Sequence, residues 1–329
     1  MKVKKEYIIL AVIIIALCVY LLTRSGDRTH YQLPTLAEFD SGNISKIEIS
    51  KDNDTITLIK KDSQWYLEPM GYLADTQKVN GMLAVFETLS LAALVSESKD
   101  YQRYDLNPEK RVSARAWQGD ALMRNLDIGK AAPSFRHTFV KLGDDSRVFH
   151  ANDNFRSKFD QTLDNLRDRG VLSFQITDIQ SLQLTKDQES VELIRNEIPV
   201  EPAASQPEKT DASSAVAVKF VWQDRNGKNI NDQDLSRLLT TLSTLKCAGY
   251  INDRKKDSFS GPIYTVKLKG AQEHQLDIFA KLENDPEHHP AVSSGSDYPF
   301  LLSDSQIKQI MKDPAEMLKT PQEDKKTSE

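Results

Sequence analysis

The chain opens with one continuous apolar stretch. Tyr7 to Leu22 (YIILAVIIIALCVYLL) holds no charged residue, while three lysines precede it and Arg24 follows it. A helix of this length rises about 25 Å, near the lower limit for crossing a bilayer. The excess of lysine on the amino side places that end in the cytoplasm. The pattern predicts a single-pass transmembrane anchor within residues 1–24, in an inner (cytoplasmic) membrane, with the bulk of the chain in the periplasm.

A cleaved signal peptide is the alternative for this stretch. Its apolar core would usually be about 7–15 residues long and would end at a small-residue cleavage site. Here the apolar core is longer, and Thr23-Arg24-Ser25 is a poor cleavage site. An uncleaved anchor is therefore the preferred interpretation.

Beyond a polar spacer at 25–43, the pattern changes to short alternating segments. Ile44 to Ser50 and Thr55 to Ile59 alternate apolar and polar residues around an Asn- and Asp-rich turn, which is typical of a β-hairpin. Trp65 begins a third predicted strand, and Asp75 is a plausible N-cap for a helix with apolar residues at helical spacing. Further strands are expected within 111–150, including one from Phe135 to Leu142. An amphipathic helix at 155–166 is expected to close at Gly170.

The same order of patterns then begins again. Ile47 to Lys60 (IEISKDNDTITLIK) matches Leu182 to Arg195 (LQLTKDQESVELIR) at nearly every position. Phe86–Ser90 corresponds to Leu239–Ser243 within a second helical pattern at 232–245, and the Leu-Asp-Ile sequence at 126–128 returns at 276–278. The fold class expected is α+β: after the anchor, two tandem, duplicated α+β domains with largely antiparallel sheets. Their predicted bounds are 44–175 and 176–313, with a flexible insertion at 198–215 and a disordered tail at 314–329.

Composition narrows the class of partner. The chain has 329 residues and a net charge of −5, and its first 24 residues are positively charged, so the remainder is more acidic still. An acidic domain is a poor candidate for nucleic acid, which is excluded as a partner. The two cysteines lie far apart, Cys18 in the apolar stretch and Cys247 after a helical pattern. We expect Cys247 to be a buried thiol and not a nucleophile.

A set of short motifs carries a family resemblance. They are the Ile44–Ser50 hairpin sequence, Trp65 with Pro69, Ala74-Asp75, Tyr104-Asp-Leu-Asn-Pro108, Leu126-Asp-Ile-Gly129 and Leu166-Arg-Asp-Arg169. Together they resemble the bacterial family known as domain of unknown function 4340, clearly over about 44–175 and weakly beyond. This chain has Asp105 where that family usually has glycine. The resemblance implies a membrane-anchored envelope protein, often encoded near ABC-type transporters, and it supplies no catalytic residue.

The sharpest local cluster of possible metal ligands is Asp285, His288 and His289. Adjacent histidines with a nearby carboxylate can bind zinc or another divalent ion. However, side chains at i and i+1 diverge on any regular element, and no HExxH motif occurs in the chain. A solvated loop is therefore preferred to a metal site, and no cofactor is expected. His137 and His150 fall on expected strands and are interpreted as structural.

Arg167, Asp168 and Arg169 form the other notable cluster. The preferred interpretation is a guanidinium–carboxylate lock in which Asp168 is structural. In the alternative, Arg167 and Arg169 bind an anionic ligand or a carboxylate of a partner. Asp75 and Trp65 are likewise assigned structural roles.

The functional hypothesis is a non-enzymatic, membrane-anchored periplasmic interaction module, with an ABC-type transporter subunit as its protein partner. The absence of a phosphate loop, a dinucleotide fingerprint and a GxSxG sequence supports this hypothesis. The alternative is a cell-envelope hydrolase or ligand-binding protein that acts in a cleft between the two repeats.

Overall fold

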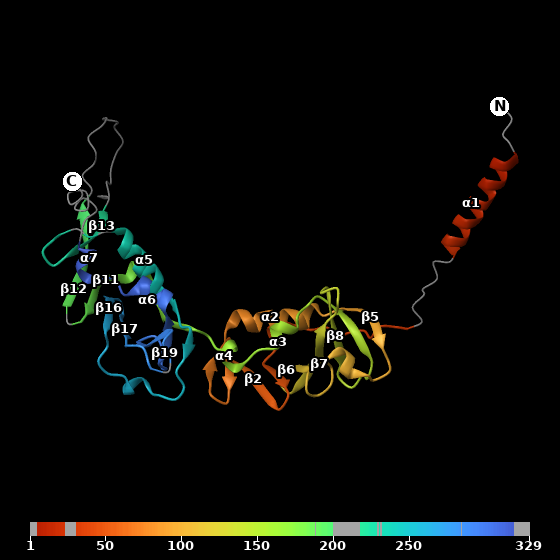
Figure 1. Cartoon of the computed structure of the whole chain (residues 1–329), viewed down its shortest axis with the longest axis horizontal. Coiled ribbons are helices and arrows are strands. Elements are labelled where there is room, and N and C mark those ends of the chain that lie inside the picture. The colour runs from red at the N-terminus through yellow and green to blue at the C-terminus, as the bar shows by residue number, and fades with distance from the viewer. Residues whose placement is uncertain are drawn as a thin grey trace, which may run out of the picture. The chain divides into compact units, whose positions relative to one another are not determined.

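The computed structural model describes residues 5–23, 31–187, 189–199, 218–228, 230, 232–283 and 285–318. The chain divides into two compact units between Leu166 and Arg167 (Figure 1).

Helix α1 (Lys5–Thr23) is the first helix of the first unit and contains the apolar run. No helix in the described part of the chain is long and apolar enough to cross a membrane. The prediction of a transmembrane helix in this stretch is therefore wrong. The physical reason is length, because Tyr7–Leu22 spans about 25 Å as a helix, whereas the hydrocarbon core of a bilayer is about 30 Å thick.

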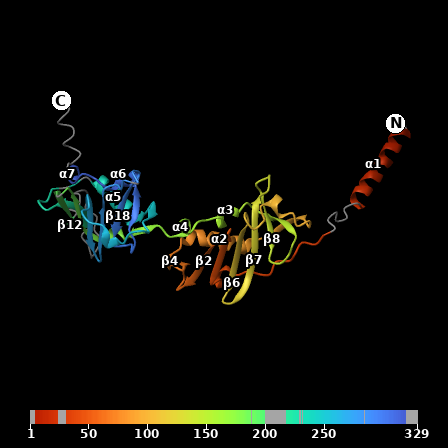
Figure 2. The same cartoon turned by 60° about the horizontal axis from the view of Figure 1, so that its bottom comes forward.

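The first unit is built on a nine-stranded antiparallel sheet, in the order β4-β3-β2-β1-β6-β7-β8-β9-β5 (Figure 2). Hairpins join the neighbours in sequence, and β1 and β5 pair with strands far along the chain. The strands are β1 (Lys46–Lys51), β2 (Asp54–Lys61), β3 (Gln64–Glu68), β4 (Tyr72–Leu73), β5 (Leu91–Ser96), β6 (Val112–Gln118), β7 (Ala121–Ala131), β8 (His137–Leu142) and β9 (Val148–Asn152).

The main core of this unit lies between one face of the sheet and helix α2 (Thr76–Thr88). On the sheet, Ile47 is fully buried, in register between Leu58 of β2 and Ala116 of β6. On the helix, Val79 and Phe86 are fully buried at positions seven apart, so both face the sheet. The period-two alternation of the strands and the helical period of α2 thus bury one common apolar layer.

A buried arginine fixes the segment before β1. Arg124 of β7 is 9% exposed and donates to the carbonyl oxygens of Ala37 at 2.6 Å and Phe86 at 3.3 Å. Burial lowers the pKa of its guanidinium. The Phe86 carbonyl belongs to the last turn of α2, so Arg124 satisfies a helix-end acceptor and holds residues 31–43 against the unit.

The opposite face of the sheet carries a smaller core under the loop that holds the 3₁₀ turn η2 (Tyr101–Tyr104). The Tyr104 and Phe139 rings lie 4.9 Å apart between centroids. Gly129 of β7 lies beneath this loop, and a Cβ there would come within 2.2 Å of the Tyr104 carbonyl oxygen. Glycine is therefore required for the loop to pack on the strand.

The predicted helix at 155–166 differs in the structure. Two short helices replace it, α3 (Arg156–Phe159) and α4 (Leu163–Leu166), with Asp160 ending the first. Gly170 is not a helix C′ residue, because it begins strand β10 (Gly170–Ser173). Phe159 and Leu166 are both fully buried, so the apolar spacing reports burial of two turns and not one continuous helix.

The second unit has an eight-stranded antiparallel sheet in the order β13-β12-β11-β16-β17-β18-β19-β15, and a separate β10-β14 pair. Helices α5 (Asp232–Ser243) and α6 (Asp304–Ile310) contact each other, and both contribute to the core on the sheet. Residues 244–245, which were predicted as the end of a helix, instead belong to strand β14. The strands that follow β10 are β11 (Ile179–Lys186), β12 (Glu189–Pro199), β13 (Val218–Asp224), β14 (Thr244–Lys246), β15 (Gly249–Tyr250), β16 (Tyr264–Gly270), β17 (Glu273–Ile278), β18 (His288–Ser293) and β19 (Phe300–Ser303). The described part of the chain also contains the short helix α7 (Pro314–Met317) and the 3₁₀ turns η1 (Ser41–Asn43), η3 (Ile176–Asp178) and η4 (Lys256–Ser258).

The two large sheets have the same strand order. When β1 is set against β11, the order β3-β2-β1-β6-β7-β8-β9-β5 in the first sheet matches β13-β12-β11-β16-β17-β18-β19-β15 in the second. Strand β4 is an addition at the edge of the first sheet. An ion pair is repeated as well: Lys51 lies 2.7 Å from Asp160, and Lys186 lies 3.3 Å from Asp313. Each pair joins the end of β1 or β11 to the segment that follows β9 or β19.

The division between units falls nine residues before the predicted bound of 175. Strand β10 pairs with β14, which places residues 170–173 in the second unit. The predicted insertion at 198–215 lies almost wholly outside the described residues, between the end of β12 and the start of β13. Of the predicted tail at 314–329, the structure describes 314–318, which include α7.

Candidate functional site

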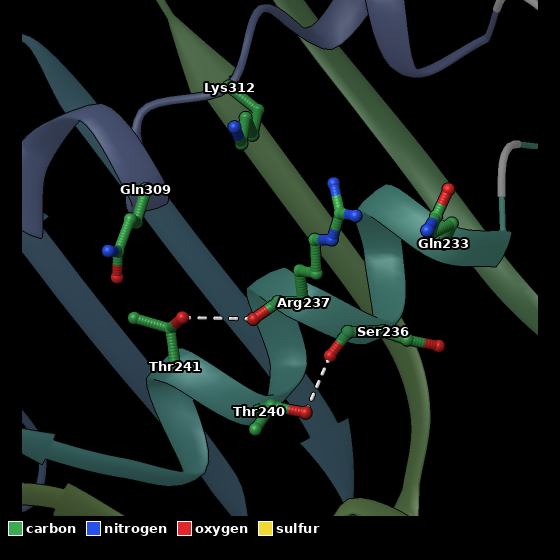
Figure 3. A pocket seen from close by; sticks show the side chains of 7 residues that line it. All are labelled: Gln233, Ser236, Arg237, Thr240, Thr241, Gln309 and Lys312. Carbon is green, nitrogen blue, oxygen red and sulfur yellow. Dashed lines mark hydrogen bonds between the residues drawn. The ribbon is translucent and has the colours of Figure 1, made fainter.

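The candidate site is an open groove on the second unit, of about 780 Å³, which we call the α5–α6 groove (Figure 3). Helix α5 provides one wall and the end of α6 the other. Figure 3 shows Arg237 extending from α5 on the side where Lys312 lies, and Gln309 pointing from α6 toward Thr241. The residues that line the groove are Gln233, Ser236, Arg237, Thr240, Thr241, Gln309 and Lys312.

The sequence of α5 separates its two faces. Leu235, Leu238, Leu239 and Leu242 are at most 2% exposed and face the core. They recur at i, i+3, i+4 and i+7, which is the spacing of one helical stripe. The residues between them are polar and form the wall of the groove.

The hydroxyl groups of this wall are partly used inside the helix. Thr240 Oγ1 donates to the Ser236 carbonyl oxygen at 2.7 Å, and Thr241 Oγ1 donates to the Arg237 carbonyl oxygen at 2.9 Å. Bonded in this way, each threonine hydroxyl can still accept a hydrogen bond but offers no proton to a ligand. The donors that remain among the lining residues are the Ser236 hydroxyl and the cationic and amide side chains.

The charge of the groove is positive. Arg237 and Lys312 line it, and of the described lining residues none is Asp or Glu. Within the described residues, Arg237 forms an ion pair with Asp234 at 3.7 Å, with side chains 67% and 42% exposed. An exposed ion pair of that length is weak, so the guanidinium remains able to engage a second carboxylate.

A capping box fixes the second wall. Ser303 is the N-cap of α6, and its hydroxyl accepts from the Gln306 backbone while Gln306 Oε1 accepts from the Ser303 backbone N–H at 3.0 Å. Gln306 Nε2 also donates to the Lys246 carbonyl oxygen at 2.6 Å. The start of α6 is therefore held to β14, which follows α5 directly, and the two walls of the groove are positioned together.

The first unit has a smaller pocket of about 370 Å³ along the matching helix α2. With Phe86–Ser90 set against Leu239–Ser243, Ala84 falls at the position of Arg237 and Glu87 at that of Thr240. Both of these first-unit residues line the smaller pocket. The repeated fold therefore offers a hollow beside the same helix twice, but the cationic wall belongs to the second unit.

The histidines that the sequence singled out point to different partners. His288 Nδ1 lies 2.9 Å from Asp285 Oδ1, and that contact lowers the pKa of the Asp285 carboxyl. His289 Nδ1 donates to the Phe279 carbonyl oxygen at 2.9 Å, and its Nε2 lies 3.8 Å from Asp304. Adjacent residues of β18 face opposite sides of the strand. Across the described residues, no three His, Cys, Asp or Glu side chains are grouped to hold a metal ion.

Arg167 and Arg169 lie inside the second unit. Arg167 is 3% exposed, and its guanidinium carbon lies 3.4 Å from the centroid of the Tyr250 ring and 4.4 Å from that of Tyr298. Arg169 Nη1 donates to the Ala248 carbonyl oxygen at 2.7 Å. The structure therefore commits these guanidinium groups to stacking and to backbone contacts within the unit.

The residues assigned structural roles make local hydrogen bonds. Asp75 Oδ1 accepts from the backbone N–H groups of Gln77 at 2.9 Å and Lys78 at 3.2 Å, as the N-cap of α2. Asp168 Oδ1 accepts from the Gly170 backbone N–H at 2.7 Å. Trp65 is 3% exposed in the main core of the first unit.

The remaining titratable candidates are partly or fully buried. Cys247 is 4% exposed, and burial raises the pKa of its thiol, which weakens it as a nucleophile. The His137 and His150 rings are stacked with centroids 5.3 Å apart. Burial first, and the neighbouring His137 second, lower the pKa of His150.

The sequence pointed to none of the groove residues. The pattern at 232–245 predicted a helix, and the outward positions of that helix could be read from it. The approach of Gln309 and Lys312 could not, because they are about 70 residues away along the chain. A single local signal was present: the outward face of this helix bears small hydroxyl residues, where a solvated helix usually carries many charges.

The described part of the chain is built mainly on two large antiparallel sheets that share one strand order. The chain belongs to the family described as Domain of unknown function (DUF4340), whose family model matches residues 65–261. The resemblance inferred from the sequence motifs is thereby confirmed, and the match includes parts of both units. No curated protein and no solved structure matched the chain.

Proposed function

We propose that the protein is a non-enzymatic interaction module whose α5–α6 groove binds an acidic segment of a partner protein. The partner we propose is a subunit of an ABC-type transporter, because the family that the motifs resemble is commonly encoded near such transporters. The location in the cell envelope stays a prediction.

One observation supports this function above the others: two cations line an open groove whose described lining contains no carboxylate. Such a surface attracts carboxylates and repels basic segments. The donors lie on two walls, with Arg237 on α5 and Lys312 beyond α6, so an extended segment can contact both.

The shape also favours a polypeptide. A volume of about 780 Å³ is within the range of small-molecule sites. However, the groove is open to solvent, and its lining residues carry amide, hydroxyl and cationic groups beside a mostly apolar surface of methyl and methylene groups. An extended chain can place alternate side chains against such a wall, whereas a small metabolite would stay largely hydrated.

The expected affinity is modest and sensitive to salt. Each exposed charge pair contributes about 0.2–1 kcal/mol, and salt screens it. Reversing both cations replaces two attractions with two repulsions, so we expect binding to weaken by about 10-fold, or about 1.4 kcal/mol.

The test uses the full chain and two labelled peptides of equal length, one rich in Glu and one in which every Glu is Lys. Fluorescence anisotropy should show binding of the Glu peptide, about 10-fold weaker binding by the Arg237→Glu/Lys312→Glu variant, and loss of binding at high salt. Lys267→Glu is the matched control, because this exposed lysine lies on β16 of the same unit and outside the groove lining. Equal affinity for both peptides, or equal weakening by Lys267→Glu, would refute the groove as an acidic-segment site.

The transporter assignment needs its own measurement. A photo-crosslinking residue at Thr240, in cells that make the full chain, should form an adduct with a transporter subunit. The adduct should disappear in the Arg237→Glu/Lys312→Glu background. An adduct with an unrelated protein that meets this second criterion would retain the interaction module and overturn the choice of partner.

A further inference from the structure

The turn between β7 and β8 presents one aromatic side chain to solvent. Phe135 is 73% exposed, the highest exposure among the large apolar side chains of the described residues. Its backbone has φ of 56°, in the left-handed region. The sequence pattern placed Phe135 at the start of a buried strand, but β8 begins two residues later, at His137.

This conformation is unfavourable for phenylalanine. Left-handed φ brings Cβ close to the backbone, and glycine, asparagine and aspartate tolerate it far better than a bulky side chain. Here the side chain gains little in return, since it is mostly in water. Strained residues that persist in a rigid frame are characteristic of functional positions, so the outlier calls for a role outside the fold.

The frame around Phe135 is well ordered by hydrogen bonds. The Ala132 backbone N–H donates to the His137 carbonyl oxygen at 2.8 Å, and the Phe135 N–H donates to the Ala132 carbonyl oxygen at 2.8 Å. The Asp153 N–H donates to the Arg136 carbonyl oxygen at 2.9 Å, which ties the turn to the end of β9. The aromatic ring is thus carried by a turn that is fixed on both sides.

The duplicated unit shows that the fold itself does not need this feature. The corresponding connection, between β17 and β18, begins with Phe279, which is 8% exposed and lies 5.2 Å from the ring of Phe259. Within the described residues of that connection, Lys281 is paired with Asp304 and Asp285 with His288. Among the described residues of that connection, the same sheet order is therefore built without an exposed large apolar side chain.

Two basic residues lie close to Phe135 along the chain. Lys130, near the end of β7, and Arg136, directly after Phe135, are both exposed. No ion pair within the described residues involves Lys130 or Arg136. An exposed apolar side chain with two exposed basic residues near it along the chain is complementary to an apolar pocket with an acidic rim.

We propose that Phe135 is a preorganised docking anchor that inserts into an apolar, carboxylate-rimmed pocket on a protein partner, with Lys130 and Arg136 contacting the rim. This surface belongs to the first unit and does not depend on the α5–α6 groove. The strained backbone favours binding, because a ring that is already held outward loses little conformational freedom when it enters the pocket.

The first test concerns the folded protein. Phe135→Asn places a residue that tolerates left-handed φ in the turn, so the full chain should melt at the same temperature or a few degrees higher. A lower melting temperature would show that the ring stabilises the unit and would overturn the proposal.

The second test identifies the contact. The probe is p-benzoylphenylalanine at position 135 of the full chain, with position 122 as the matched control, because Leu122 is an exposed apolar residue on another hairpin and has negative φ. A protein captured at 135 and not at 122 is then purified and titrated. We expect Phe135→Asn to weaken its binding at least 10-fold, Lys130→Glu/Arg136→Glu to do likewise, and Phe135→Tyr and Leu122→Asn to leave it unchanged.

Other outcomes have definite meanings. A lipid adduct, a crosslinked dimer of this chain, or unchanged affinity with Phe135→Asn would each refute the anchor. With the probe at position 135, the Arg237→Glu/Lys312→Glu variant should still capture the same partner. Failure of the groove proposal and failure of the anchor proposal are therefore distinguishable.

Discussion

Ser113 on β6 donates its hydroxyl proton to the Asp127 carboxylate on β7 at 2.6 Å, and the two residues face each other in register. Arg111 and Lys141 each lie 3.2 Å from the same carboxylate. The second unit repeats the relationship, since Thr265 on β16 donates to Asp277 on β17 at 2.8 Å. The aspartate of each Leu-Asp-Ile sequence therefore links neighbouring strands and is explained by the stability of the sheet.

The first prediction concerns this pair. Ser113→Ala leaves a nearly buried carboxylate with one donor fewer, so we expect the free energy of unfolding to fall by about 1.5–3 kcal/mol in urea titrations at pH 7. Ser50→Ala is the control, because its hydroxyl bonds Thr55 at 2.9 Å on the exposed surface and should cost less than about 0.5 kcal/mol. Equal losses from the two variants would contradict the importance of the Asp127 bond.

The strands could be predicted from the sequence because their evidence is local. Ile47 and Ile49 alternate with polar residues, and both are buried. The strand order could not, because β1 pairs with β6, more than 60 residues away, and no local period reports that contact. The same limit hid the α5–α6 groove, whose walls meet through the fold.

The local pattern also gave wrong predictions at two places where the chain leaves a regular helix or strand. The apolar spacing at 155–166 is real, but Asp160 ends α3 and pairs with Lys51 at 2.7 Å, so the helix stops there. Phe135 was expected in a strand because aromatic residues favour strands. Its left-handed backbone has no signal in the sequence, since a bulky residue there is the exception.

The second prediction concerns Gly129. A Cβ at this position would lie 2.2 Å from the Tyr104 carbonyl oxygen and 3.1 Å from that of Phe139, and neither backbone atom can move freely. Gly129→Ala should therefore destabilise the protein by about 2 kcal/mol or more, measured by chemical unfolding.

Gly81 provides the matched control for that measurement. It lies inside helix α2, and a Cβ there would meet nothing within 4 Å. Gly81→Ala should raise the free energy of unfolding by about 0.5–1 kcal/mol, because alanine favours the helix. A destabilisation of similar size at both positions would show that the Tyr104 contact is not the cause.

The third prediction explains a departure from the family pattern. Asp105, where the family usually has glycine, adopts φ of 55° and ψ of 37°. Aspartate is among the few non-glycine residues that tolerate this region. Asp105→Gly should change the free energy of unfolding by less than about 1 kcal/mol, whereas Asp105→Val should lose about 1–2 kcal/mol. Both variants lose the same 3.4 Å ion pair to Lys110, so their difference isolates the backbone.

The last prediction concerns pH. His150 stacks on His137 and lies 4.7 Å from the Phe139 ring, and its buried Nε2 has no hydrogen-bond partner among the residues that the structure describes. Burial and the neighbouring His137 lower the pKa of His150 in the folded protein below its value of about 6.5 in the unfolded chain. Between those two values the unfolded state binds more protons, so the free energy of unfolding falls as pH falls.

Replacing His150 with Phe removes this proton uptake and keeps an aromatic ring in the stack. We therefore expect the His150→Phe variant to gain stability relative to the wild type as pH is lowered from 8 to 5, measured by urea unfolding at each pH. Above the unfolded pKa, His150 is neutral in both states, so the difference between variant and wild type should be constant there. Parallel pH profiles across the whole interval would mean that His150 titrates alike in the folded and unfolded chain, contrary to its buried position beside His137.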